Sequence, residues 1–131
     1  MSVFHLSVVT PDRMFFDGEA ERVIVHTVSG DVGILKGHAK YVSVLGIGAL
    51  RIKTADGERI AALAEGFIKA DKDKTLILAS ACEWNHEIDV SRAKRAEEAA
   101  RRQLEAAKDT AEQAAAEARL KRALNRLRLA E

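Results

Sequence analysis

The chain has little cysteine and almost no proline, since Cys82 and Pro11 are the only residues of their types. A single cysteine excludes an internal disulfide and predicts a protein of a reducing compartment. No apolar run approaches the ~20 residues needed to span a bilayer, and the first residues lack the basic and apolar regions of a signal peptide. We therefore expect a soluble chain in the cytoplasm.

Glycine is also absent from a long part of the chain. All eight glycines precede residue 67, and residues 88–131 contain neither glycine nor proline. Since these two residue types let a backbone turn, their absence over residues 88–131 predicts helix. The earlier part consists of short Val, Ile and Leu runs separated by glycine. We predict two domains, a β-sandwich over residues 1–86 and a helical hairpin over residues 87–131.

Alternating and short apolar runs predict the strands of the first domain. Phe4, Leu6 and Val8 alternate with more polar neighbours, as in a half-buried strand. Asp56-Gly57 is typical of a tight turn between two strands. Further strands are expected over residues 22–27, 41–45, 50–53, 60–63 and 75–79, with one more between Gly66-Phe67 and the turn at residues 72–74. Their short and regular spacing predicts an antiparallel sandwich or a flattened barrel.

The glycine-rich stretch over residues 30–35 invites comparison with a phosphate-binding loop. It reads Gly-Asp-Val-Gly-Ile-Leu, without the G-x-x-x-x-G-K-S/T spacing, and no helical pattern follows it. We therefore expect a turn between strands at this place.

No arrangement typical of catalysis or of metal binding stands out. The four histidines lack metal-ligand spacing. Glu83, His86 and Glu87 could be drawn as a metal cluster, but we favour a polar connector between the domains. The chain shows no Ser/His/Asp or Cys/His arrangement, which argues against an enzyme.

Two start signals divide the glycine-free part into two helices. Asp89 can cap the first turn of one helix, and Asp109 with Glu112 resembles a capping box for a second. Apolar residues recur every three or four positions, first Ala93, Ala96, Ala100, Leu104 and Ala107, then Ala116, Leu120, Ala123, Leu124 and Leu127. We predict an antiparallel hairpin joined near Lys108-Asp109. One continuous helix of ~60 Å is the alternative, because the joint has no glycine or proline.

Positive charge gathers at the end of the chain. Residues 1–87 carry 10 Lys/Arg against 12 Asp/Glu, whereas residues 88–131 carry 11 against 8. The last helix holds a basic run without acidic residues, formed by Arg119, Lys121, Arg122, Arg126 and Arg128. Such a run can meet nucleic acid, an acidic partner or a phosphate group, or it can be a solvated basic face.

Several short motifs in their order resemble the epsilon subunit of F-type ATP synthases over nearly the whole chain. The motifs are Thr10-Pro11, Gly18-Glu19-Ala20, residues 30–35, Gly37-His38-Ala39, Gly66-Phe67 and residues 88–93. The resemblance implies a β-sandwich followed by a two-helix hairpin, in agreement with the pattern of the residues. It also implies a non-catalytic rotor subunit of a bacterial ATP synthase, at the cytoplasmic side of the membrane.

The resemblance further implies a set of protein partners. The sandwich would grip the gamma subunit and rest on the c-ring, with Asp31 facing the ring and His38 facing gamma. The extended hairpin would inhibit ATP hydrolysis when its basic second helix reaches acidic segments of the alpha and beta subunits. Partner contacts are therefore expected at Arg119, Lys121, Arg122, Arg126 and Arg128.

The resemblance also implies a nucleotide site, because some bacterial relatives of the family bind ATP on the folded hairpin through an I-D-x-x-R-A motif, present here at residues 88–93. By position, Glu83 and Asp89 would meet the adenosine of ATP, with Ile88 and Ala93 packing nearby. Phosphates, with or without Mg, would meet the guanidinium groups of Arg92, Arg122 and Arg126. In the alternative interpretation Asp89 is only a helix cap and Arg92 only pairs with a carboxylate. Ala99 stands where such relatives can carry a further basic residue.

Two other classes of function fit the sequence less well. A nucleic-acid-associated factor would insert the basic hairpin, but Trp84, Tyr41 and the four Phe show no stacking pattern. A small β-sandwich enzyme of cupin type lacks its His-rich metal motif. We therefore expect the rotor subunit, with no catalytic residue and no metal site.

Overall fold

The computed structural model describes residues 2–130, which form two compact units that divide between Trp84 and Asn85. The first unit contains the strands β1 (Phe4–Val9), β2 (Met14–Ala20), β3 (Arg22–Thr27), β4 (Gly30–Ile34), β5 (Tyr41–Leu45), β6 (Gly48–Thr54), β7 (Gly57–Leu63), β8 (Gly66–Ala70), β9 (Lys74–Ala79) and β10 (Cys82–Trp84). The second unit contains a short 3-10 helix, η1 (Asn85–Glu87), and the helices α1 (Val90–Ala106) and α2 (Thr110–Leu129). The predicted fold class, a β-sandwich followed by two helices, is confirmed.

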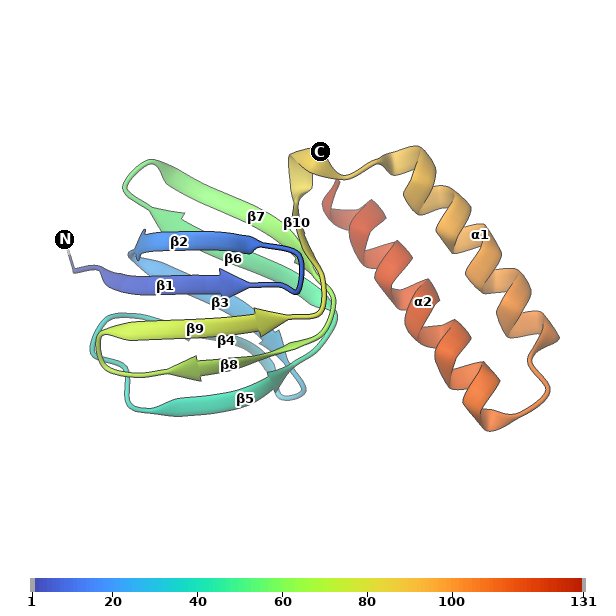
Figure 1. The fold of residues 1–131 in the computed structure, drawn as a ribbon, viewed down its shortest axis with the longest axis horizontal. Helices are drawn as coiled ribbons and strands as arrows, with labels where there is room; N and C mark the ends of the chain where they lie inside the picture. The colour runs from blue at the N-terminus through green and yellow to red at the C-terminus, as the bar shows by residue number, and fades with distance from the viewer. Residues whose placement is uncertain (1, 131) are drawn as a thin grey trace. The chain divides into compact units, whose positions relative to one another are not determined.

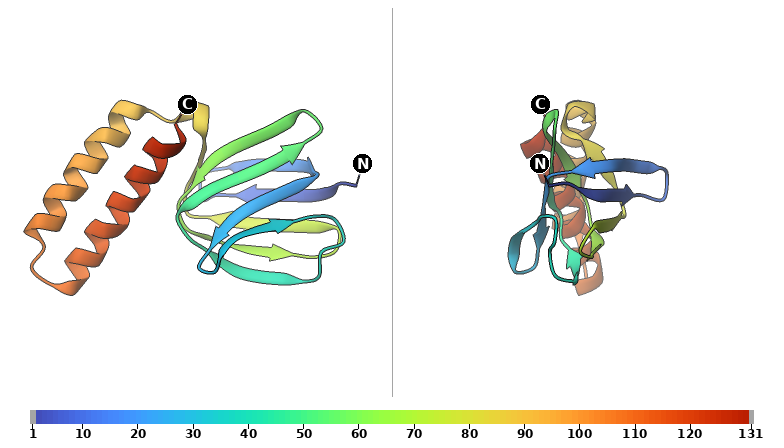
Figure 2. Two further views of the ribbon diagram at one scale, coloured as in Figure 1. Left: turned by 180° about the vertical axis from the view of Figure 1, so that it is seen from behind. Right: turned by 90° about the vertical axis from the view of Figure 1, so that its left-hand side faces the viewer.

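The strands of the first unit form one nearly closed sheet. Its order is β10-β7-β6-β3-β5-β8-β9-β1-β2, and β4 pairs with β3 beside this path. In Figure 1, β1, β2, β5, β8 and β9 make the near layer, and Figure 2 shows β3, β6 and β7 from behind. The pairs are antiparallel except that β1 lies parallel to β9. A parallel pair needs a long crossover, and the chain between Val9 and Lys74 supplies it.

The core lies between the two layers, and most of its fully buried side chains are aliphatic. The largest fully buried apolar side chains are Leu6, Ile34, Leu45, Leu50, Ile52, Ile68, Ile77, Val8, Val23 and Val25. In β1, burial alternates with exposure along the strand, as the Phe4, Leu6 and Val8 pattern predicts. Burying each such side chain contributes about 1.5–3 kcal/mol, so this set dominates the stability of the unit.

Aromatic side chains close the sheet where its two end strands meet. Phe15 of β2 stacks on Trp84 of β10 with ring centroids 4.3 Å apart, and Phe16 meets the same indole edge-on at 6.4 Å. The guanidinium of Arg59 lies 3.7 Å from the centroid of the Trp84 ring. Aromatic and cation–π contacts of this kind add to the burial of the rings themselves. Trp84 therefore fixes the last strand to the sandwich.

Three strands, β2, β4 and the short β10, run through segments where the sequence predicts none. Residues 30–34, expected to be a turn, form β4, and the turn is Val28-Ser29, closed by a 2.8 Å hydrogen bond from the Thr27 hydroxyl to the Gly30 carbonyl. Gly30 has a φ of 112°, which only glycine adopts easily. A glycine that is typical of a turn is therefore the first residue of the strand. β2 lacks the alternation of apolar and polar residues that predicts a strand, because Phe15 and Phe16 are consecutive. A bulge also interrupts its pairing with β1 at Val8/Val9.

The predicted hairpin at Asp56-Gly57 is confirmed. β6 and β7 pair from Gly48↔Leu63 to Thr54↔Gly57, so the link is Ala55-Asp56 and Gly57 is the first residue of β7. Gly57 has a φ of 119°, which explains the need for glycine at this position.

Both predicted helix caps are confirmed. The Asp89 carboxylate accepts a 3.1 Å hydrogen bond from the Arg92 N–H, and the Asp109 carboxylate accepts one of 2.7 Å from the Glu112 N–H. Glu112 reaches back to the Lys108 N–H at 2.8 Å, one residue before the usual partner in a capping box. Because the backbone at Asp109 is extended, the chain forms two helices and not the continuous helix considered as the alternative.

The two helices pack along a narrow line of alanines. Ala93 and Ala100 are buried on α1, and Ala116 and Ala123 on α2. The spacing is seven residues in each helix, which is typical of a coiled-coil seam and narrower than the predicted stripe. For this reason Ala96 and Leu124, both expected in the stripe, are exposed. A 3.2 Å hydrogen bond from Arg119 to the Gln103 side chain joins the helices at their surface.

Candidate functional site

The exposed apolar side chains of the near layer gather on the outward face of β5, β8 and β9. Val44 pairs in register with Phe67, and Phe67 pairs with Leu78, so the three side chains stand side by side across three strands. Val42 and Leu76 flank Lys69 in the next row of the same face. We call Val42, Val44, Phe67, Leu76 and Leu78 the apolar strip.

The strip continues toward the edge of the sheet. Val9 of β1 pairs with Leu78, and Met14 of β2 pairs with Val9. Val44 is 64% exposed and Met14 is 55% exposed, although both are apolar. A contiguous exposed apolar surface on a small domain indicates a place where another molecule binds.

The sequence pattern does not predict the strip, because an apolar strand residue can face either the core or solvent. A signal was present, since residues 75–79 are apolar on both faces of the strand. Ile77 points into the core while Leu76 and Leu78 point outward. A strand that is apolar on both faces must be covered on both faces. Within the first unit only the inner face is covered.

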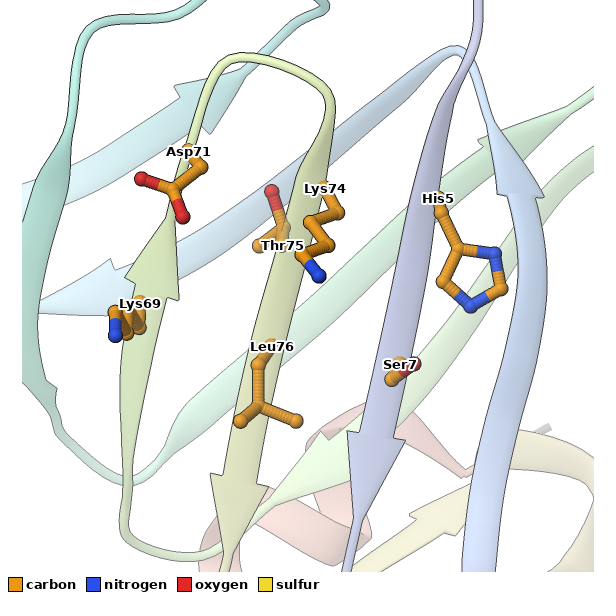
Figure 3. Close-up of a pocket in the computed structure, with 7 residues that line it drawn as sticks. All are labelled: His5, Ser7, Lys69, Asp71, Lys74, Thr75 and Leu76. Atoms are coloured by element: carbon orange, nitrogen blue, oxygen red, sulfur yellow. The ribbon is translucent and has the colours of Figure 1, made fainter.

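A hollow of about 350 Å³ lies beside the strip (Figure 3). Its lining residues are His5, Ser7, Lys69, Asp71, Lys74, Thr75 and Leu76. Leu76 belongs both to the hollow and to the apolar strip, so the two surfaces are continuous.

The structure brings a serine, an aspartate and a histidine together at this place. The Asp17 carboxylate lies 2.6 Å from Nε2 of His5 and accepts a 3.1 Å hydrogen bond from the Ser7 hydroxyl. Nucleophilic catalysis needs the imidazole, not the carboxylate, against the hydroxyl that it activates. The cluster therefore holds the surface of β1 and β2 in place and is not a triad.

The described residues 2–130 show neither a metal-binding cluster nor a membrane-spanning helix. There, no three His, Cys, Asp or Glu side chains gather as metal ligands would, and Glu83, His86 and Glu87 form no such group. No helix of the described residues has the length and apolarity that crossing a membrane requires.

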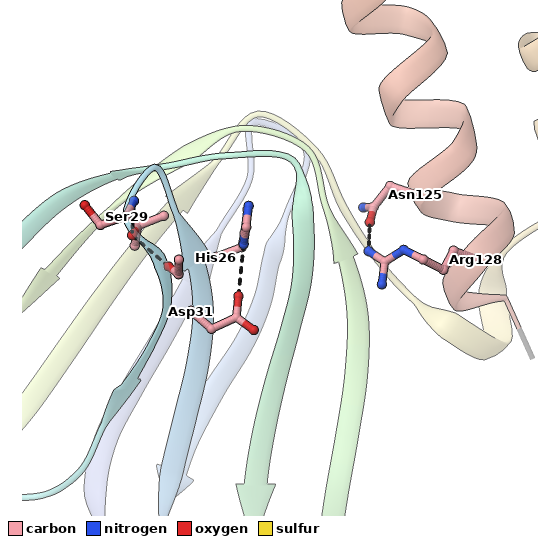
Figure 4. Close-up of polar contacts among 7 residues, drawn as sticks. His26, Ser29, Asp31, Asn125 and Arg128 are labelled. Carbon is pink, nitrogen blue, oxygen red and sulfur yellow. Dashed lines mark hydrogen bonds and ion pairs between the residues drawn. The ribbon is translucent and has the colours of Figure 1, made fainter.

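Asp31 lies on the hairpin of β3 and β4. Its carboxylate is 2.9 Å from Nδ1 of His26 on the paired strand (Figure 4). His26 in turn packs over the backbone at Gly48, where an added Cβ would stand 2.7 Å from the His26 Cβ. Val28, at the tip of the same hairpin, is 90% exposed. The hairpin thus exposes one carboxylate that is held by His26 and one valine side chain that is almost fully exposed to solvent.

His38 lies in the loop between β4 and β5. Its Nδ1 is 2.6 Å from the Ala39 carbonyl oxygen, and its ring meets Tyr41 edge-on at 5.9 Å. Gly37 has a φ of 80° and donates a 2.8 Å hydrogen bond to the Lys72 carbonyl. The loop is therefore tied to the turn between β8 and β9.

The residues expected at a nucleotide site belong to both units. Glu83 is in β10, whereas Ile88, Asp89, Arg92, Ala93, Arg122 and Arg126 belong to the helical unit. Because α1 and α2 are antiparallel, the first turn of α1 and the last turns of α2 lie at one end of the hairpin. Arg92 therefore shares that end with Arg122 and Arg126. Asp89 and Ala93 also have structural roles, as a cap and as a buried seam residue.

Some cations of α2 already have partners within the hairpin. Arg128 donates a 2.6 Å hydrogen bond to the side chain of Asn125, which is buried (Figure 4). Arg119 donates a hydrogen bond to the side chain of Gln103. Lys121 is exposed.

Family models match both parts of the chain. Residues 3–85 match the β-sandwich domain of the ATP synthase delta/epsilon chain, and residues 86–131 match its long α-helix domain.

Curated relatives match at full length. The chain is 45% identical over 131 residues to an ATP synthase epsilon chain of Ruminococcus albus, covering 99% of this chain and 98% of the relative. It is 46% identical over 128 residues to one of Alkaliphilus metalliredigens, covering 98% and 96%. A relative from Propionigenium modestum, 40% identical over 131 residues and covering 100% and 96%, is named as sodium ion specific.

Solved structures share the fold at low sequence identity. A chain of the Euglena gracilis mitochondrial ATP synthase matches with a TM-score of 0.80 at 22% identity, covering 92% of this chain and 77% of that one. A chain from the central stalk and c-ring of the Tetrahymena thermophila enzyme matches with a TM-score of 0.65 at 18% identity, covering 95% and 94%.

Proposed function

This chain belongs to the family of ATP synthase epsilon chains, and we propose that it is a non-catalytic stalk subunit linking the gamma subunit to the c-ring. In this role it would lie at the cytoplasmic side of a bacterial membrane and reach the membrane only through the complex. The rival interpretation, a nucleic-acid-associated factor, has no support among these relatives.

The apolar strip is the observation that carries the proposal. Its side chains stand on one sheet face in adjacent registers, so one partner surface can cover them together. Burial of apolar area is the dominant favourable term in most protein association, which makes such a face a source of binding energy. We assign this face to the gamma subunit, and the nearby His38 loop to the rim of the same contact.

The β3–β4 hairpin is proposed to meet the c-ring. Asp31 supplies a carboxylate held by His26, and Val28 supplies an apolar tip. A fixed charge beside an apolar tip suits the polar loops of a ring, because it gives orientation as well as contact.

The helical unit is proposed to act as a brake on ATP hydrolysis. Its two helices meet mainly through alanine, whose methyl group contributes only about 0.8 kcal/mol on burial. Weak packing with high intrinsic helicity suits an element that has two arrangements. The cations of α2 would then meet acidic segments of the alpha and beta subunits.

ATP, with or without Mg, is proposed as the ligand that keeps the hairpin folded. Arg92, Arg122 and Arg126 lie at one end of the hairpin, so a polyphosphate there would connect both helices. A ligand that binds only the folded hairpin stabilises it by mass action. Asp89, at the same end of the hairpin, would meet the adenosine in this proposal.

Binding of the gamma subunit tests the proposal most directly. We expect Val44→Ser and Phe67→Ser each to weaken the complex by about tenfold, because truncating a central apolar contact typically costs more than 1 kcal/mol. Titration calorimetry with full-length variants measures the change.

Val28→Ser is the matched control, since it removes the same side chain from an exposed site off the strip. It should bind gamma like the wild type. Wild-type affinity in both strip variants would refute the assignment of this face.

A further inference from the structure

Basic residues of the first unit are unevenly distributed. Of its ten Lys/Arg, five fall in residues 36–40 and 69–74, where Asp71 and Asp73 are the only acids. The remainder of the unit carries five Lys/Arg against nine Asp/Glu. The five lysines of the two stretches are Lys36, Lys40, Lys69, Lys72 and Lys74. Outside these two stretches, the first unit therefore carries a net negative charge.

The two stretches lie together in space. Gly37 donates its N–H to the Lys72 carbonyl, and Tyr41 pairs in register with Ala70. Asp71 donates its N–H to the Lys74 carbonyl at 2.8 Å and closes the turn between β8 and β9. We call this part of the sandwich, with its five lysines, the lysine end.

The lysine end is open for binding. All five lysines are exposed, and none forms an ion pair within residues 2–130. Lys69 and Lys74 line the hollow of Figure 3, where Asp71 is the only carboxylate in the lining. Asp17, beyond the hollow, is already engaged by His5 and Ser7. Uncompensated positive charge thus faces outward on one side of the hollow.

The lysine end and the apolar strip form one continuous face. Lys69 stands between Val42 and Leu76 in register, and Leu76 lines the hollow beside Lys74. A partner that covers the strip must therefore also lie over or beside the lysines.

We propose that the lysine end docks an acidic segment of the same gamma subunit that covers the apolar strip. This inference rests on the proposed function and adds the chemistry that the partner must present. Its contact surface must carry carboxylates next to an apolar patch. Exposed charges at the rim of an interface mainly raise the association rate, while the buried apolar part keeps the complex together.

The test measures association and dissociation rates of the full-length chain with its own gamma subunit at low and at high salt. We expect Lys69→Glu with Lys74→Glu to slow association about tenfold at low salt, with little change in dissociation. The difference should shrink at high salt, because salt screens exposed charges. Surface substitutions at these outward positions leave the core intact, which the fluorescence of the buried Trp84 checks.

A matched control is Lys53→Glu with Lys94→Glu, since both lysines are exposed, lie outside the lysine end and give the same net charge. Control and wild type should associate at similar rates. Equal rates in the test and control variants at both salt concentrations would overturn the inference. If the test variant fails to fold, Lys69→Gln with Lys74→Gln should still slow association. An unchanged association rate in this variant would also overturn the inference.

Two further outcomes separate this inference from the proposed function. A wild-type chain that does not bind gamma at all refutes the proposed function itself. If reversal of the lysines abolishes binding to phosphatidylglycerol vesicles but leaves gamma association unchanged, the surface belongs to lipid and the inference is wrong.

Discussion

At the scale of single residues, the close approach of strands decides which side chains are allowed. Gly66 opens β8, and an added Cβ there would stand 2.3 Å from the backbone oxygen of Leu78. Backbone atoms of a paired strand cannot move aside as a side chain can. Gly66→Ala is therefore expected to lower the free energy of unfolding by about 1–3 kcal/mol, which urea denaturation followed by tryptophan fluorescence measures.

Gly33→Ala provides the comparison for that substitution. An added Cβ at Gly33 meets only the Ile24 side chain at 3.9 Å, an ordinary contact. Its unfolding free energy should stay within about 0.5 kcal/mol of the wild type. Equal loss in both variants would show that the glycine effect is not steric.

Residue-level predictions from sequence succeed where the interaction is local. The caps Asp89 and Asp109 could be predicted because each bonds to a backbone N–H three residues ahead. The need for glycine at position 66 could not, because the atom that excludes a side chain belongs to a strand twelve residues away. The His5–Asp17 pair was missed for the same reason.

At the scale of elements, the helical hairpin is the part that a ligand can control. Near a hundredfold excess over its Kd, ATP should stabilise the folded hairpin by about 2.7 kcal/mol and raise its melting temperature. Arg92→Ala and Arg126→Ala should weaken ATP binding about tenfold, because each removes a charged contact to phosphate. Calorimetry and melting followed by far-UV circular dichroism measure both effects.

Arg101→Ala is the control for this experiment, because Arg101 pairs with Glu97 on α1 and lies outside the predicted nucleotide site. It should bind ATP like the wild type. Equal binding by all four proteins would remove Arg92 and Arg126 from the site.

Strands could be predicted from the sequence where the pattern of apolar residues matches the two-residue period of a strand. Residues 22–27 and 41–45 form strands over the ranges that the sequence predicts. β2 and β4 were missed because a bulge disturbs one and glycines replace the alternating side chains in the other. The apolar strip, likewise, was not predicted, because a strand that is apolar on both faces does not reveal which face remains open.

At the scale of the whole molecule, the proposed brake depends on charge at the end of α2. Lys121→Gln with Arg128→Gln should raise ATP hydrolysis by the reconstituted synthase on the order of fivefold, the lower end of typical coupling between sites. The cause would be weaker contact with acidic segments of the alpha and beta subunits. Steady-state hydrolysis of the complex measures it.

Arg101→Gln with Arg102→Gln removes two cations from α1 instead and should leave hydrolysis unchanged. If both double variants raise hydrolysis equally, net charge and not the α2 surface controls the brake. If neither does, the braking role of this surface is wrong.

The stacking of Trp84 on Phe15 has a practical consequence for such experiments. Trp84 is the only tryptophan of the chain, and it is buried where the sheet closes. Its fluorescence emission therefore reports on the sandwich alone, whereas far-UV ellipticity is dominated by α1 and α2. The two optical signals give separate unfolding curves for the two units from one unlabelled sample.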